Sequence, residues 1–144
     1  MEKAIAIITA RGGSKRIPRK NIKEFCGKPI IAYSIEAAKK SGRFSEIMVS
    51  TDSEEIAEIS RNYGANVPFL RSKKTSDDYA TTADVLMEVL DGYKQREREF
   101  EYTCCIYPTA PFVTEDKLIR AMEIMERKNP VAVMPVVQFS YPPQ

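Results

Sequence analysis

The fold is decided by residues 4–21, which read AIAIITARGGSKRIPRKN. Residues 4–8 form a continuous apolar run of strand length, which is typical of a strand buried on both faces of a sheet. The loop that follows, residues 9–27, is rich in glycine and in positive charge. A buried strand that leads into such a loop predicts an α/β protein with an anion-binding site at the carboxyl end of that strand.

Outward from this stretch, strand-like and helix-like segments alternate. Further strands are predicted at residues 46–50, 65–70, 102–107 and 131–137, and helices at residues 29–40, 51–64, 82–95 and 114–125. Residues 71–80 are expected to form a loop. This order predicts an α/β, Rossmann-like architecture, in which helices cover both faces of a mainly parallel sheet. The loops after the strands should meet in one crevice.

Composition narrows the choice of function. The chain has 144 residues, one domain's worth, and its 43% hydrophobic content is ordinary for a globular protein. It contains no histidine, which excludes Ser–His and Cys–His nucleophile pairs and histidine-ligated metals. A metal would therefore sit on oxygen ligands, which favours Mg²⁺. The three cysteines are predicted to be small buried hydrophobic residues. Without a membrane-length apolar run or a signal peptide, the expected location is the cytoplasm.

Positive charge is concentrated in one loop. Residues 1–23 hold seven basic groups and one acid, whereas the rest of the chain is net negative. A compact polyanion such as a triphosphate suits this distribution better than a nucleic acid, which needs an extended basic stripe. A nucleic acid is therefore not expected as a partner, and without a membrane-length apolar run a membrane is not expected either.

The loop also has the residue types of a phosphate site. Gly12 and Gly13 let backbone N–H groups curl around an anion, and Ser14 adds a hydroxyl donor. Arg11 offers a planar fork of donors and Lys20 a point charge. A solvated basic loop that serves only solubility is the alternative.

These residues, together with GKPIIAYSIEAA, VSTDSEEIAEI, VPFLR and YPTAPFVT, resemble the cytidylyltransferases that activate acidic sugars. That group contains the CMP-N-acylneuraminate synthetases and the KDO cytidylyltransferases, and the resemblance is nearest to members that use pseudaminic acid. It implies a nucleotide-diphospho-sugar transferase fold and Mg²⁺ as cofactor. It also implies transfer of CMP from CTP to the C2 hydroxyl of a nonulosonic acid, with release of pyrophosphate.

The resemblance assigns roles to single residues. Arg11 and Lys20 would be catalytic, because they would stabilise the departing pyrophosphate. Tyr107 and Thr109 would contact the sugar; Tyr107 stands where sialic-acid-activating relatives carry glutamine, which favours a less usual acceptor. The nucleotide would be bound by Ala10, Arg11, Gly12, Gly13, Ser14, Lys15, Lys20, Asn21, Arg71, Ala80, Thr81 and Thr82.

Alternatives remain for several of these residues. Asn21 suits a turn, Arg71 a salt bridge at the rim, and Thr82 the cap of the next helix. Tyr107 is alternatively a packing residue. Asp52 is interpreted as a helix cap rather than a metal ligand, because TDSEE is typical of a helix start. The pair Asp77 and Asp78 is given a structural role rather than a catalytic one.

The chain is expected to be the N-terminal, nucleotide-binding portion, residues 1–144, of a longer cytidylyltransferase. The run FSYPPQ, residues 139–144, directly follows the last expected strand, so the C-terminal part of the fold should be missing. The resemblance places the metal ligands in that part, so they are unknown here, and implies a homodimer for the full-length protein. The alternatives are N-acetylneuraminate or KDO as acceptor, and a truncated CTP-binding module without full activity.

Overall fold

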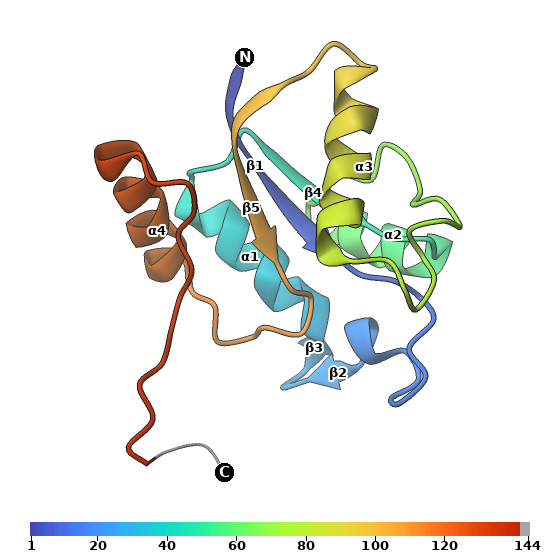
Figure 1. Cartoon of the computed structure of the whole chain (residues 1–144). Helices are drawn as coiled ribbons and strands as arrows, with labels where there is room; N and C mark the ends of the chain where they lie inside the picture. The colour runs from blue at the N-terminus through green and yellow to red at the C-terminus, as the bar shows by residue number, and fades with distance from the viewer. Residues whose placement is uncertain (142–144) are drawn as a thin grey trace.

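A computed structural model describes residues 1–141, and a three-stranded parallel sheet lies at its centre (Figure 1). Its order is β4-β1-β5, with β1 at Glu2–Thr9, β4 at Glu46–Ser50 and β5 at Phe100–Ile106. A hairpin follows β1, formed by β2 (Glu24–Phe25) and β3 (Lys28–Pro29), and a short 3₁₀ helix, η1 (Lys20–Ile22), precedes it. The helices are α1 (Ile30–Ser41), α2 (Glu54–Asn62), α3 (Thr82–Lys94) and α4 (Glu115–Lys128).

The strand β1 is the core of the molecule. Ala4 to Ile8 are completely buried, as the continuous apolar run predicts. β1 pairs in parallel with β4, where Ile5 lies opposite Glu46, and with β5, where Glu2 lies opposite Phe100. All three carboxyl ends therefore point to the same edge of the sheet.

Helices cover both faces of this sheet, which confirms the predicted α/β architecture. On one face, Ala6 and Ile8 pack against residues of α1, α2 and α4, including Ile35 and Leu118. On the other, Ile5 and Ile7 pack against α3 through Val89 and Tyr93. Figure 1 shows α1 and α4 on one side of the strands and α3 on the other.

Two predicted strands are wrong. Residues 65–70 contribute only one bridge, between Asn66 and Met48. Residues 131–137 form no strand, and apolar side chains such as Val136 and Val137 are more than four-fifths exposed. Their composition favours a strand, but a strand needs a paired neighbour, and no described residue supplies one. Residues 142–144, the last three of the FSYPPQ run, lie outside the described residues.

Local predictions also need correction. Cys26 is exposed rather than buried, and Cys104 and Cys105 are half-buried. Cys26 and Gly27 both have positive φ, 48° and 88°, because they form the tight turn of the β2–β3 hairpin. The cap of α3 is Thr81, not Thr82.

Candidate functional site

A pocket of about 200 Å³ lies at the carboxyl ends of the strands. It brings together the end of β1, the helix η1, the loop before α3 and the segment after β5. Nine residues predicted from the sequence line it: Arg11, Lys20, Asn21, Arg71, Ala80, Thr81, Thr82, Tyr107 and Thr109. The sequence did not single out Thr9, Val85 and Pro108, which also line it, although each is within three residues of one that was.

The lining has one sign of charge. Arg11, Lys20 and Arg71 contribute three cations, and no acidic residue of the described chain lines the pocket. Low-dielectric walls around charges of one sign concentrate the field inside a cleft and attract ligands of the opposite sign. The pocket is thus suited to a ligand that carries several negative charges.

Arg71 is the buried cation of this pocket. Only 9% of it is exposed, and burial lowers the pKa of its guanidinium. Its Nε donates to Ser50 Oγ at 3.0 Å and its Nη2 to the Ser50 carbonyl at 2.8 Å. No carboxylate within residues 1–141 approaches it to salt-bridge distance, so the rim salt bridge considered from the sequence is wrong.

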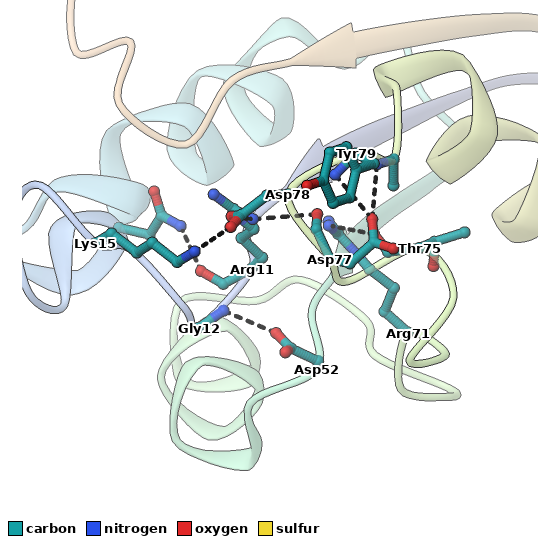
Figure 2. A network of polar contacts seen from close by, with 11 residues as sticks. Arg11, Gly12, Lys15, Asp52, Arg71, Thr75, Asp77, Asp78 and Tyr79 are labelled. Carbon is teal, nitrogen blue, oxygen red and sulfur yellow. Dashed lines mark hydrogen bonds and ion pairs between the residues drawn. The ribbon is translucent and has the colours of Figure 1, made fainter.

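Arg11 and Lys15 are held by a neighbouring loop (Figure 2). Nη1 of Arg11 donates to Asp78 Oδ1 at 2.7 Å and to the Asp77 carbonyl at 3.1 Å, and Lys15 pairs with the same Asp78 carboxylate. Hydrogen bonds from Lys15 and Arg11 hold the pKa of Asp78 below its ordinary value. Asp78 therefore stays ionised at neutral pH.

The glycine segment lies beside the pocket rather than in its wall. Gly12 donates its N–H to Asp52 Oδ1 at 2.7 Å, so this amide does not face a ligand, and neither Gly12 nor Gly13 has positive φ. A Cβ on Gly12 would lie 3.1 Å from the Cβ of Ser53, so glycine is favoured here by close packing. Ala10, Ser14 and Lys15 also lie outside the lining.

The interpretation of Asp52 as a helix cap is wrong. Ser53 caps α2, because its Oγ accepts from the Ile56 amide. Asp52 instead joins the start of α2 to the glycine segment, and it cannot be recognised from local spacing because Gly12 is 40 residues away.

Asn21 and Thr81 shape the pocket through the backbone. Asn21 is buried, and its Nδ2 donates to the Arg11 carbonyl at 2.9 Å, which fixes the backbone at Arg11. Thr81 forms a capping box with Asp84, in which each side chain bonds the backbone of the other. The hydrogen bond from Thr81 lowers the pKa of Asp84.

Tyr107 is exposed at the pocket mouth, so the alternative of a packing residue is wrong. Its hydroxyl lies 3.4 Å from Thr82 Oγ1, and Ser34 of α1 donates to its carbonyl at 2.8 Å. The segment after β5 is thereby held between α1 and the start of α3.

Three further observations concern other parts of the described chain. Among residues 1–141, no three acidic or cysteine side chains gather to hold a metal ion. A second hollow, about 480 Å³, lies on α4, but it mixes acids and bases and contains no predicted site residue: Asp116, Ile119, Arg120, Glu123, Ile124, Arg127 and Lys128. No helix of the described chain is long and apolar enough to cross a membrane.

Known proteins resemble this chain over nearly its whole length. Residues 5–140 match the model of one protein family, described as Cytidylyltransferase. The chain belongs to the cytidylyltransferase family. It is 44% identical, over 99% of its length, to a pseudaminic acid cytidylyltransferase of Campylobacter jejuni, of which it spans 61%. It is also 39% identical, over 92% of its length, to a CMP-N,N'-diacetyllegionaminic acid synthase of Legionella pneumophila, of which it spans 58%.

Solved cytidylyltransferase structures show the same fold. A CMP-2-keto-3-deoxy-manno-octonic acid synthetase, solved in complex with CTP, superposes with a TM-score of 0.74 at 23% identity. The superposition covers 89% of this chain and 49% of that one. The predicted resemblance and fold are thus confirmed, and the chain spans about three fifths of the length of these two curated relatives.

Proposed function

We propose that the chain binds CTP and takes part in transfer of CMP to the C2 hydroxyl of a nonulosonic acid, with release of pyrophosphate. The observation that carries this proposal is the pocket of Arg11, Lys20 and Arg71, which has three cations and no acid in its lining. A nucleoside triphosphate provides the opposite charge, and relatives at 44% and 39% identity are named for this chemistry.

Within the pocket, we assign the triphosphate to Arg11 and Lys20 and the cytosine to Arg71. The guanidinium of Arg71 carries N–H donors that suit the cytosine carbonyl. A hydrogen bond to this acceptor should stabilise a buried arginine that has no carboxylate partner. The segment of Ala80, Thr81 and Thr82 lies beside it and offers backbone and hydroxyl donors and acceptors. Tyr107 and Thr109, at the mouth, are assigned to the sugar.

In the reaction, the oxygen of the sugar C2 hydroxyl forms a bond to the α-phosphorus of CTP. The bond from that phosphorus to the bridging oxygen breaks, pyrophosphate leaves with the bonding electrons, and the hydroxyl proton passes to water. The enzyme contributes mainly by orienting the reactants and neutralising charge. Arg11 and Lys20 stabilise the charge that develops on the leaving pyrophosphate.

The wider predictions stay part of this proposal. Mg²⁺ is retained as cofactor, but the residues described do not form a site for it, so no step is assigned to it. Pseudaminic acid is the proposed acceptor, since the 44% identical relative carries that name. A cytoplasmic location, no nucleic-acid or membrane partner and, for the full-length protein, a homodimer complete the proposal.

Thermal unfolding with CTP, UTP, GTP or ATP, each with Mg²⁺, tests the binding step. A ligand that binds only the folded state raises the melting temperature. We expect a rise that is specific to CTP. Lys20→Met should reduce this rise, whereas Lys23→Met, a matched loss of an exposed lysine outside the pocket, should not.

Pyrophosphate release then tests the transfer step. The assay uses CTP with pseudaminic acid, N-acetylneuraminic acid or KDO, and we expect release only with pseudaminic acid. Stabilisation by CTP without release from any acceptor would reduce the function to that of a CTP-binding module. Equal stabilisation by all four nucleotides would contradict the cytidine site.

A further inference from the structure

Arg11 and Lys15, which flank the glycine segment, are both ion-paired with the carboxylate of Asp78. Asp78 places one carboxylate oxygen against Nη1 of Arg11, at 2.7 Å, and the other against Nζ of Lys15 (Figure 2). These residues are 67 and 63 positions apart in the chain. A carboxylate bridged by two cations resembles a phosphate oxygen edge in charge and in spacing.

The loop that carries Asp78 is built to present it. Asp77 accepts at Oδ1 from the amides of Tyr79 and Ala80, at 2.9 and 2.8 Å, which closes a tight turn around Asp78. Nη1 of Arg11 also binds the Asp77 carbonyl, at 3.1 Å. Asp78 is thus held on Arg11 by both its side chain and its backbone neighbour.

The same loop continues into the pocket wall. Ala80, Thr81 and Thr82 follow Asp78 directly and line the pocket. At its other end, Glu88 of α3 accepts from Ser72 and Thr75, which ties the loop to the helix. A contact that holds Asp78 on Arg11 therefore also sets the position of the residues next to the nucleotide.

We propose that Asp78 is an internal competitor of the phosphate groups: a bound polyphosphate displaces its carboxylate from Arg11 and Lys15 and so releases the turn at Asp77 and Asp78 from Arg11. This inference rests on the proposed function, since it concerns the same site. Asp78 is a regulatory residue of the site, and it lowers the affinity of the resting protein for every anion that must take its place.

The competition follows from charge. An anion that binds Arg11 and Lys15 must first break two ion pairs, and that cost is subtracted from its own attraction to the cations. Both pairs are partly exposed, with 40% of the Asp78 side chain accessible, so the cost is moderate. Removing the charge of Asp78 should therefore raise the affinity for polyphosphate by about three- to tenfold.

Calorimetric titration with inorganic tripolyphosphate, in the wild type and in Asp78→Asn, tests the proposal. Asparagine keeps the shape and loses the charge. Asp91→Asn is the matched control, because it removes an exposed carboxylate on α3 that does not line the pocket. We expect tighter binding to Asp78→Asn, no change in Asp91→Asn, and the same order for Asp78→Ala.

Equal or weaker binding to both Asp78 variants, or binding to none of the proteins, would overturn the competitor role. Parallel titrations of the wild type with CTP and UTP judge the proposed function separately. A wild type that prefers CTP while Asp78→Asn gains nothing would retain the function and reject the competitor. If Asp78→Asn binds tripolyphosphate more tightly but the wild type shows no preference for CTP over UTP, the competitor role is retained and the proposed function is rejected.

Discussion

Two arginines at opposite ends of the same sheet are treated differently by the fold. At the amino end, Arg98 donates from Nε and Nη2 to the two carboxylate oxygens of Glu2, at 2.6 and 2.8 Å, and its Nη1 pairs with Glu46. Its guanidinium also lies over the rings of Tyr93 and Phe100. At the carboxyl end, Arg71 has only neutral partners and is more deeply buried.

The pKa values follow this difference. The hydrogen bond from Arg98 to Glu2 raises the pKa of Arg98, whereas burial lowers the pKa of Arg71. The charge of Arg98 is neutralised by Glu2 and Glu46, so these contacts stabilise the fold. A buried charge with no carboxylate at salt-bridge distance costs folding free energy, because the more distant charges of Asp52 and Glu88 offset its desolvation only in part. A ligand can offset more of that cost. The second arginine is therefore the better marker of a binding site.

The largest expected effect is at the amino end. Arg98→Met leaves the carboxylate of Glu46, whose side chain is 4% exposed, buried without its cation. Loss of the cation beside this buried carboxylate should lower the free energy of unfolding by about 3 kcal/mol, the low end for buried ion pairs, because the Arg98 side chain is itself 36% exposed. Urea unfolding measures it. Lys94→Met, which removes an exposed pair with Glu99, should cost less than about 1 kcal/mol. If both variants lost the same free energy of unfolding, Arg98 would not be important for the stability of the fold.

At the carboxyl end, the effect should appear in binding instead. Arg71→Met is expected to weaken CTP binding about thirtyfold, or about 2 kcal/mol, because the acceptor on the base loses a charged donor. The free energy of unfolding should change by only about 1 kcal/mol, since the variant loses hydrogen bonds but also loses a desolvated charge. Calorimetry with CTP and urea unfolding give both numbers. If Arg71→Met lowered the free energy of unfolding as much as Arg98→Met and left the CTP affinity unchanged, Arg71 would be a structural residue like Arg98.

The smallest effect is on the pH dependence of stability. Arg98 lowers the pKa of Glu2 below its ordinary value of 4.5. A lowered pKa contributes stability above the unfolded value, and this contribution is lost as the pH falls through the folded one. Unfolding free energies from about pH 6 to about pH 3 should therefore decrease less steeply in Arg98→Met than in the wild type. Parallel curves would show that Glu2 is not coupled to Arg98.

The sequence predicts well what neighbouring residues decide. The five apolar residues from Ala4 to Ile8 predict the central strand, and the basic loop after it leads to Arg11, Lys20 and Asn21, which the structure brings together in one pocket. Arg71 and Tyr107 were found through resemblance to a family, because their chemistry alone does not separate a ligand contact from a salt bridge or a packing residue.

What the sequence misses depends on contacts between distant segments. Asp52 binds Gly12 and Asp78 binds Arg11, and neither partner can be recognised from local spacing. Residues 131–137 have the composition of a strand, but strand formation depends on a neighbour that none of the described residues supplies. Sequence composition shows that residues 131–137 are able to form a strand, whereas pairing with a neighbouring strand determines whether they do.

The position of β1 has a consequence for how the chain is made. Its residues Ala4 to Ile8 are completely buried, with β4 and β5 on either side, yet the register of the strand pairs Glu2 with Phe100. A ribosome adds about 5–20 residues per second, so β1 waits several seconds at least before the residues of β5 exist. During that time one of the most apolar segments of the molecule has an unpaired edge in water. Chaperone binding to the nascent chain should therefore centre on the same residues that later form the middle of the sheet.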